Sequence, residues 1–496
     1  MELTENIWKS RMDTDNKIRK NYIYNVTYQI LNLIAPLLTT PYVARVLGVE
    51  QIGRYSYISS ITTYFITLAI LGSTPYAQRE IAYLKGNREK YSQLFWEMVT
   101  FRTLTVLISG LLYGIIIVSA PAEERLLYIL QGINIIIVAV DITWFFQGLE
   151  NFKKVVIRNM IVRCVSIVLI FLFVKKESDL AIYMLILSGT PLVGQALIWG
   201  YLKRYLEPIS IKKINIKQHF KGIMVLFVPT IAVSIYRAFD KTMIGIFTDS
   251  SSENGYYEQA DRIVQMCITV PTALSTVMAP RIASNMAKKN IDMVNEYMYK
   301  TYEALLLIAM PLGVGIFCTS NMIVPWFLGE QYYKVITLLK IFSIIIPIIA
   351  LSNATGAQYL IQAREEKVYT KSIFLGAIVN FGLNLLMIPQ IASVGAAIAS
   401  VIAEFSILLY QMLYICKKNR TLKLKQLFNN LWTCIISCMG MTLIVVLVNP
   451  FFQPDFLGTI CVAVIGACTY GVMLLIFKEP MVCSILDAIM EKLSRK

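Results

Sequence analysis

Charged residues are scarce in this sequence of 496 residues: 16% are Asp, Glu, Lys or Arg, whereas 56% are hydrophobic. Soluble globular proteins average about 25% charged residues, so the composition excludes an ordinary soluble domain. Strict alternation of apolar and polar residues is also absent, which argues against a membrane β-barrel. Apolar runs of roughly 18–25 residues recur instead, and each is long enough to cross a bilayer as a helix. The sequence therefore predicts an all-α polytopic membrane protein.

Histidine is almost missing, because His219 is the only one in the sequence. The nine cysteines lie mostly inside the apolar runs, and no His or Cys spacing typical of a metal site occurs. Cys434 and Cys438 are one helical turn apart, which favours packing over chemistry. The sequence also lacks a Gly-rich phosphate loop and any Ser–His or Cys–His pair. We therefore expect no metal, no bound cofactor and no enzymatic activity.

About fourteen transmembrane helices are expected, joined by short connections. Their ranges are 22–44, 52–73, 94–118, 126–147, 156–174, 180–202, 222–247, 257–279, 298–319, 334–360, 373–388, 394–416, 431–449 and 457–477. The polar segment 1–21 precedes an apolar run that has no small-residue cleavage site after it, so we expect no signal peptide.

Lysine and arginine are distributed unevenly over the connections. With the N-terminus inside, about 34 of the 46 basic residues fall in inner segments and about 6 in outer segments. This bias predicts that both termini are cytoplasmic. It also accounts for the formal net charge of +15, and no clustered basic patch suggests binding to nucleic acid.

Short motifs recur at a spacing of six helices. "FFQGLENFKKV" (145–155) follows the fourth span and "YLIQAREEKV" (359–368) follows the tenth, while "REIA" (79–82) and "PRIAS" (280–284) follow the second and eighth. An even spacing predicts two six-helix lobes related by a pseudo-two-fold axis along the membrane normal, with two extra C-terminal helices. The expected division is 1–202 (N-terminal lobe), 203–221 (basic cytoplasmic linker), 222–416 (C-terminal lobe) and 417–496 (the last two helices and the tail).

Three charged residues, Arg237, Asp240 and Lys241, interrupt the seventh span in "SIYRAFDKTMIGIF" and share one helix face. The eighth span has a matching polar face in "YYEQADRIVQ" (256–265), which includes Asp261 and Arg262. An ionised side chain at the bilayer centre costs about 2.5–3.5 kcal/mol, so such groups face a partner or a water-filled cavity. We expect either a hydrated, partly cationic cavity that binds substrate or an ion-pair network that joins the two helices.

Polar residues also mark the first two spans. Asn25 and Gln29 lie one turn apart on span one, and Arg45 and Arg54 flank the outer ends of spans one and two. Polar faces on the leading pair of helices in each half would line one central cleft. The alternative is ordinary interhelical packing, worth about 0.6 kcal/mol per contact.

Two acidic residues lie deep in other expected spans: Asp141 in "VAVDITWFF" and Glu404 in "VIAEFS". An acid at this depth can exchange a proton, or it can be a neutral acid bonded to a neighbouring helix. With Asp240 and Asp261, these two residues are the candidates for ion coupling. Other charged residues that we expect to be buried within the spans are Arg102, Arg163 and Lys340.

Four motifs carry a resemblance to a known family. They are "NYIYNVTYQILNLIAPLLTTPYVARVLGVEQIGRYSY" (21–57), "REIAY" (79–83), "DITWFFQGLENFK" (141–153) and "DKTMIG…ENGYYEQADRI" (240–263). With these motifs the whole chain resembles the polysaccharide transporter branch of the multidrug/oligosaccharidyl-lipid/polysaccharide exporter superfamily. It is most similar to bacterial flippases for O-antigen and capsule repeat units.

The resemblance implies two lobes around a central V-shaped cavity in the bacterial cytoplasmic membrane. By alternating access, such a protein moves an undecaprenyl-pyrophosphate-linked oligosaccharide to the outer leaflet for cell-surface polysaccharide synthesis. A proton or sodium gradient is the implied driving force, and polysaccharide polymerase machinery is an implied partner. Related lipid II flippases place cavity arginines on the first, second and eighth helices, a role for which Arg45, Arg54 and Arg262 are available here.

Three other functions remain open. Flippases for teichoic-acid precursors or for lipid II fit the same pattern. A cation-coupled multidrug antiporter would need carboxylates deep in the cleft, so the cations Arg237, Lys241 and Arg262 disfavour it. A membrane polymerase or ligase of glycans would be expected to have a long outer loop, and the outer connections here are short.

Overall fold

The computed structural model describes residues 2–210, 212, 214–419 and 421–494. Side chains are described for all of these except residues 2–30, 32, 33, 152, 228–230, 232–237, 488, 489 and 492–494. Throughout this part of the chain the regular elements are helices, and no β-strand occurs. The chain divides into two compact units, Met1–Gln51 with Tyr55–Ala238 and Ile52–Arg54 with Phe239–Lys496. It passes from the first unit to the second within one helix, α8.

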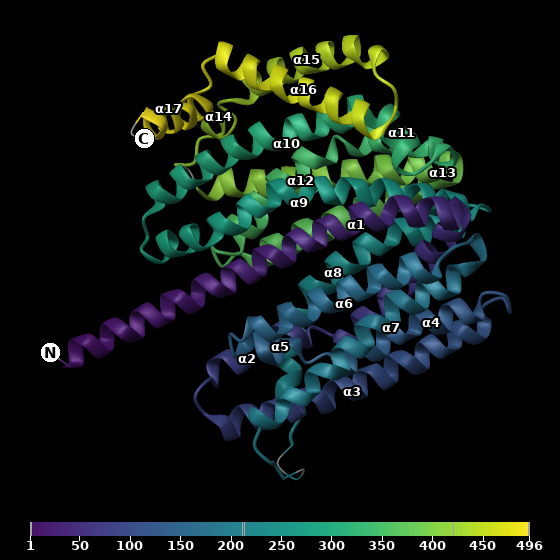
Figure 1. Cartoon of the computed structure of the whole chain (residues 1–496). Coiled ribbons are helices and arrows are strands. Elements are labelled where there is room, and N and C mark those ends of the chain that lie inside the picture. Colours follow the sequence, from purple (N-terminus) through teal and green to yellow (C-terminus); the bar gives the residue numbers. More distant parts are fainter. Residues whose placement is uncertain (1, 211, 213, 420, 495–496) are drawn as a thin grey trace. The chain divides into compact units, whose positions relative to one another are not determined.

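In the first unit α3 packs against α4, and both α4 and α6 pack against α7 (Figure 1). Its elements are α1 (Glu2–Ile70), α2 (Ser73–Tyr83), α3 (Arg88–Ser119), α4 (Arg125–Val140), α5 (Thr143–Gly148), α6 (Phe152–Phe173), η1 (Glu177–Asp179), α7 (Leu180–Ile198), η2 (Trp199–Arg204) and the first part of α8 (Lys217–Phe247).

The second unit continues from α8, and within it α9 packs against α10 while α15 packs against α16. Its other elements are α9 (Ser251–Ala287), α10 (Ile291–Phe327), η4 (Glu330–Tyr332), α11 (Tyr333–Phe342), α12 (Ile345–Asn353), the π-helix η5 (Ala354–Leu360), α13 (Glu366–Lys418), α14 (Leu424–Leu427), α15 (Leu431–Val448), η6 (Asn449–Phe451), α16 (Phe456–Ile476) and α17 (Pro480–Ser494).

The expected transmembrane ranges all fall on helices, which confirms the all-α polytopic class. Ten helices among the described residues are long and apolar enough to cross a membrane, or up to eleven if the bent pair formed by α11 and α12 with η5 is one span. Two of the long helices contain a break where the sequence predicts separate spans. The break lies at Gly48 in α1, and at Ile391 and Ala392 in α13.

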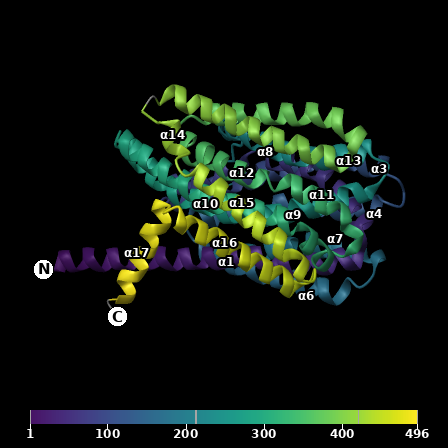
Figure 2. The ribbon, with the colours of Figure 1, turned by 90° about the horizontal axis from the view of Figure 1, so that it is seen from above.

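Helix α13 is a hairpin of two arms that run side by side, as the light green helices in Figure 2 show. The arms approach closely because small residues lie between them; Gly376 packs directly on the side chain of Ile407. The turn is held from outside by Glu253 of α9, whose carboxylate accepts hydrogen bonds from the backbone N–H (3.1 Å) and the hydroxyl (2.6 Å) of Ser393. Glu253 also pairs with Lys334 of α11 at 2.6 Å. One ion pair thus ties the hairpin turn to two other helices.

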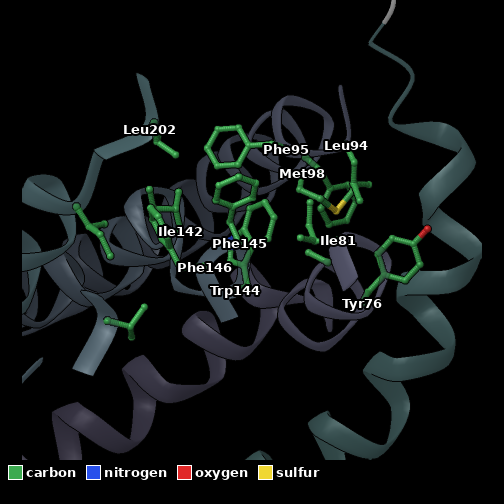
Figure 3. Close-up of a cluster of buried hydrophobic side chains, with 14 of the residues drawn as sticks. Tyr76, Ile81, Leu94, Phe95, Met98, Ile142, Trp144, Phe145, Phe146 and Leu202 are labelled. Carbon is green, nitrogen blue, oxygen red and sulfur yellow. The ribbon is translucent and has the colours of Figure 1, made fainter. Parts of the chain in front are cut away.

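An aromatic cluster fills the end of the first unit where α2, α3 and α5 meet (Figure 3). Trp144, Phe145 and Phe146 of the short helix α5 are completely buried, and Phe95 of α3 stacks on Trp144 with ring centroids 5.6 Å apart. Burying a large side chain contributes roughly 1.5–3 kcal/mol, so four such rings anchor a helix too short to be stable alone.

At the break between α4 and α5, a buried arginine forms hydrogen bonds to the backbone and to nearby hydroxyl groups. Arg102 of α3 donates to the backbone carbonyl of Asp141 (2.7 Å), to the hydroxyl of Ser73 (2.9 Å) and to that of Thr74. Its guanidinium also lies 5.5 Å from the centroid of the Trp144 ring. A carbonyl that no longer has a helical partner must be paired inside a membrane, and the planar fork of arginine supplies several donors at once.

The segment before α8 is fixed to the first unit by a buried carboxylate. Glu97 of α3 lies 2.7 Å from the imidazole Nε2 of His219 and accepts a bond from the backbone N–H of Asn215 at 3.0 Å. The other ring nitrogen of His219 lies 2.9 Å from the hydroxyl of Tyr76. The basic connection expected as a linker therefore ends in a packed, hydrogen-bonded anchor.

The turn of α13 generates a stability prediction. Ala392 adopts φ 51° and ψ −130°, a backbone conformation that favours glycine. We expect Ala392→Gly to stabilise the protein by about 1 kcal/mol, because it removes the clash that a Cβ atom meets there. The readout is the thermal unfolding temperature of the purified protein in detergent.

Ala399→Gly is the matched control, since Ala399 is fully buried in the helical second arm. That substitution should destabilise by about 1 kcal/mol. A lower unfolding temperature for Ala392→Gly would contradict the strained turn.

Candidate functional site

The carboxylate of Asp240 on α8 lies inside the second unit, with 5% of the residue exposed. Its Oδ1 accepts hydrogen bonds from the amides of Asn380 (2.9 Å) and Asn384 (2.7 Å). Its Oδ2 accepts from the hydroxyls of Tyr257 (2.5 Å) and Ser400 (2.6 Å). All four of these donors are neutral, and among the described residues no Lys, Arg or His forms an ion pair with this carboxylate. A carboxylate buried without a cation is costly unless its lone pairs are bonded, which is achieved here.

The hairpin of α13 builds most of this cage. Asn380 and Asn384 are one turn apart on its first arm, and Ser400 faces them from the second arm. Buried alanines of the second arm, such as Ala396 and Ala399, allow this close approach. The fourth partner, Tyr257, comes from α9. The cage therefore depends on the turn that Glu253 and Lys334 hold.

The same cluster is rich in oxygen ligands. The side-chain oxygen of Asn380 accepts a bond from the amide of Asn384 at 3.1 Å, while the buried oxygen of Asn384 has no hydrogen-bond partner among the described residues. Carboxylate, amide and hydroxyl oxygens are the ligands that hard cations prefer. No group of three or more His, Cys, Asp or Glu that could hold a metal ion occurs in the described part of the chain. The cluster thus suits a proton or a hard monovalent cation at Asp240.

A second, charged cluster lies one residue further along α8. Lys241 pairs with Glu258 (2.7 Å) and with Asp261 (3.2 Å) of α9, and Arg262 pairs with Glu258 at 2.9 Å. These side chains are 12–30% exposed. Two cations and two anions balance one another, so either cation must share or release a carboxylate before it can bind an anionic ligand.

The other residues expected in a substrate cavity are placed as follows. Arg237 lies in α8, and Asn25 and Gln29 lie in α1, and all three side chains are outside the described ones. Arg45 is an exposed residue of α1 in the first unit. Arg54 is half-buried and belongs to the three-residue segment of α1 that is grouped with the second unit.

Two further acids were expected as coupling candidates. Asp141 lies at the end of α4, where its carboxylate accepts bonds from the backbone N–H (3.0 Å) and hydroxyl (2.5 Å) of Thr143 and lies 3.7 Å from Arg102. These contacts match those of a residue that stabilises the break between two helices. Glu404 is a half-buried residue of the second arm of α13.

Sequence analysis missed four residues of the Asp240 cage. Tyr257 lies within the quoted polar segment of span eight but was not singled out, and Asn380, Asn384 and Ser400 were not considered. A signal was available for two of them, because asparagines at i and i+4 in an apolar span point to one polar face. Ser400 has no comparable signal, since serine commonly packs between membrane helices.

An apolar cavity of about 480 Å³ lies elsewhere in the second unit, among α9, α10, α15 and α16. Its walls include Val270, Leu312, Ile316, Val462 and Ala463. Such a lining offers contact to hydrocarbon and almost no hydrogen bonds.

Known proteins and solved structures agree on the fold. A family model described as "Polysaccharide biosynthesis protein" matches residues 18–286, and one described as MatE matches residues 225–386. An Escherichia coli protein named "Putative O-antigen transporter" is 23% identical over 391 residues, which cover 78% of this chain and 94% of that protein. Lipid II flippase MurJ of Bacillus subtilis is 21% identical over 451 residues, covering 75% and 80% of the two chains.

Among solved structures, lipid II flippase MurJ in an inward closed conformation matches with a TM-score of 0.73 and 16% identity, over 93% of this chain and 99% of that one. An inward-facing multidrug resistance MATE family transporter matches with a TM-score of 0.63 and 14% identity, over 80% and 95%. These likenesses confirm the helical two-lobe transporter fold that the sequence predicts.

The charged cluster leads to a prediction about its contribution to the stability of the protein. Glu258→Gln should lower the free energy of unfolding by about 3–5 kcal/mol, because it removes the ion pairs that Glu258 forms with Lys241 and with Arg262. Adding Lys241→Met should recover part of this loss, since the cluster then again holds equal numbers of cations and anions. Thermal unfolding temperature and abundance in the membrane measure the effect.

Glu296→Gln is the matched control, because Glu296 forms an exposed ion pair with Lys300 that should contribute about 0.5 kcal/mol or less. If Glu258→Gln is as stable as this control, the cluster does not hold α8 to α9.

Proposed function

The chain belongs to the polysaccharide biosynthesis protein family, and from this membership we propose that it is a flippase for lipid-linked oligosaccharides. The proposed reaction moves undecaprenyl-pyrophosphate-linked repeat units from the cytoplasmic to the outer leaflet by alternating access, for cell-surface polysaccharide synthesis. The observation that supports it most is the large share of this chain over which it is similar to named transporters and flippases. Relatives whose names denote O-antigen transport or lipid II flipping cover three quarters or more of this chain. Transport of a glycan rather than enzymatic chemistry on it is the activity that these names share.

The cargo explains why cations are needed in a membrane. Pyrophosphate is an anion, and arginine binds phosphate oxygens through two parallel hydrogen bonds. We assign this contact to Arg237, Lys241, Arg262, Arg45 and Arg54, with Asn25 and Gln29 for hydroxyl groups of the sugar. Lys241 and Arg262 are already paired with carboxylates of the cluster around Glu258. To bind the pyrophosphate, they must exchange a carboxylate partner for a phosphate oxygen.

The lipid part of the cargo needs a different surface. An undecaprenyl chain has no hydrogen-bonding groups, and the cavity among α9, α10, α15 and α16 is lined almost entirely by apolar side chains. We assign this cavity to the first part of the polyprenyl chain beyond the pyrophosphate.

Ion coupling is assigned to Asp240 in preference to the other acids. Asp141 faces Arg102, and Asp261 faces Lys241, so both carboxylates already have a cation. Among the described side chains Asp240 has neutral donors only, and the oxygen of Asn384 beside it has no hydrogen-bond partner there. A proton or a sodium ion entering this cage would neutralise the carboxylate and change its bonds to α9 and α13.

The proposed setting is the bacterial cytoplasmic membrane with both termini cytoplasmic, and polysaccharide polymerase machinery is the proposed downstream partner.

Two alternatives differ in cargo. A flippase for teichoic-acid precursors or lipid II would use the same cations and the same apolar cavity. A cation-coupled multidrug antiporter is favoured by the MatE match over residues 225–386 and by the MATE transporter fold. Such a pump would not need Arg237 or Arg262, whereas an anion carrier would.

Depletion of the protein in its own cell tests the cargo. We expect an undecaprenyl-pyrophosphate-linked oligosaccharide to accumulate on the cytoplasmic side, identified by mass spectrometry of extracted lipids. Arg237→Ala and Arg262→Ala should each lower glycan export by about tenfold or more, because a charged hydrogen bond to phosphate contributes about 1.5–3 kcal/mol.

Arg281→Ala is the control, since Arg281 is an exposed residue near the end of α9. Normal glycan display in both cavity variants, at wild-type abundance, would contradict an anionic cargo. Accumulation of lipid II instead of an oligosaccharide would favour the first alternative.

Asp240→Asn tests coupling in proteoliposomes. The amide keeps the shape of the carboxylate but cannot take up a cation by charge neutralisation, so transport should lose its dependence on an imposed proton or sodium gradient. Comparing the two gradients separately identifies the ion.

Asp292→Asn, an exposed change at the start of α10, should leave the gradient dependence intact. A gradient response that persists in Asp240→Asn would remove Asp240 from the coupling step.

A further inference from the structure

A second cavity, of about 390 Å³ and with a mixed polar and apolar lining, lies in the second unit between α10, α11 and the end of α15. It shares no lining residue with the Asp240 cage or with the apolar cavity assigned to the polyprenyl chain. Polar groups come from Cys318, Asn321, Lys340, Thr442 and Asn449. The remaining lining residues are apolar: Phe317, Met322, Val446, Pro450, Phe452 and Pro454.

Among the described residues that line this cavity, Lys340 is the only one with a positive charge. It forms no ion pair with a carboxylate among the described residues, unlike Lys241 and Lys334 of the same unit. Its ammonium group lies close enough to act electrostatically on the Cys318 thiol, which lies 3.8 Å from the hydroxyl of Thr442. A cation within an expected membrane span needs an anion or water nearby, so the cavity is suited to an anionic group.

Asn449 adds an acceptor to the same cavity. Its side-chain oxygen is buried and has no hydrogen-bond partner in the described part of the chain. A small rotation of the amide presents this oxygen to a hydroxyl group in the cavity. Asp455 follows shortly after in the sequence, but it is not among the residues that line the cavity, and its carboxylate accepts a hydrogen bond from the backbone N–H of Gly458 at 2.6 Å.

The cavity borders a helix face that carries exposed apolar side chains. On α15, Leu443, Val446 and Leu447 are 57–61% exposed, and Val446 is itself a wall of the cavity. In a membrane such a face contacts hydrocarbon, so the occupant can enter sideways from the bilayer. Basic side chains near the ends of membrane helices also reach towards lipid headgroups.

We propose that the cavity lined by Lys340 and Asn449 binds an anionic phospholipid that carries a phosphoglycerol headgroup. The phosphate contacts Lys340 and the exposed amide of Asn321, and a glycerol hydroxyl donates to the oxygen of Asn449. The acyl chains lie along Val446 and the lipid-facing side of α15. Given the orientation that the basic residues predict, this lipid belongs to the outer leaflet. Such a lipid would fasten α15 to α10 and α11.

Native mass spectrometry of the purified full-length protein tests this site. The protein is equilibrated in mixed micelles of phosphatidylglycerol and phosphatidylcholine, and the retained lipids are counted. Wild-type protein should retain phosphatidylglycerol preferentially. Lys340→Gln should reduce this retention about fivefold, the size expected for one cation near an anionic lipid. Asn449→Leu should weaken it less, and Lys340→Arg should keep it.

Lys425→Gln is the matched control, because Lys425 is an exposed lysine of the same unit on α14. Unchanged phosphatidylglycerol retention in Lys340→Gln would overturn the site, as would an equal loss in Lys425→Gln. If Lys340→Gln does not fold, the contrast between Asn449→Leu and Lys340→Arg decides the question.

Competition with soluble glycerol 1-phosphate identifies the source of the anion. A lipid site should keep its phosphatidylglycerol in excess glycerol phosphate, because the acyl chains add binding energy that the soluble compound lacks. Displacement at millimolar concentration would overturn the lipid assignment in favour of a soluble phosphate. The assay measures binding to purified protein, so its outcome is independent of whether the proposed flipping activity is correct.

Discussion

Backbone groups inside a membrane have no water to bond, and this constraint determines where the helices of this protein can break. At two of the breaks described here, a side chain bonds the backbone. Arg102 and the indole N–H of Trp144 donate to the carbonyl of Asp141 between α4 and α5, and Glu253 accepts from the backbone N–H of Ser393 at the turn of α13. Such positions are costly to mutate, because the polar side chain and the backbone group that it serves must both be satisfied. Some polar residues of the spans, such as Arg102 and Glu253, are therefore explained by the breaks that they stabilise.

Charges in the second unit are handled in two different ways. Lys241, Glu258, Asp261 and Arg262 neutralise one another, which is the ordinary solution for buried ions. Asp240, one residue away, is instead surrounded by neutral donors from three side-chain types. A fully paired cluster resists change, whereas a carboxylate with neutral donors can accept a cation without first losing one. The contrast is consistent with the proposal that Asp240, rather than the neighbouring ion-pair cluster, takes part in ion coupling.

Much of the fold could be predicted from the sequence, because apolar length and the distribution of basic residues report directly on membrane spans. The pairing of Lys241 with Asp261 was also accessible, since both belong to polar faces of consecutive helices. The surroundings of Asp240 were not. Neighbouring residues on a helix point about 100° apart, so Asp240 takes three of its four described donors from α13, whereas Lys241 pairs with carboxylates of α9, and only tertiary packing decides this. The hairpin of α13 brings Asn380, Asn384 and Ser400 to Asp240 from about 140 or more residues away in the chain.

Helix α8 passes from the first unit to the second between Ala238 and Phe239, and Asp240 follows directly after Phe239. One half of the helix is anchored to the first unit through His219, and the other half is held in the second unit by the cage. One continuous helix thus carries the caged carboxylate within one turn of the point where the chain passes from the first unit to the second. A charge gained or lost at Asp240 therefore acts on a helix that both units share.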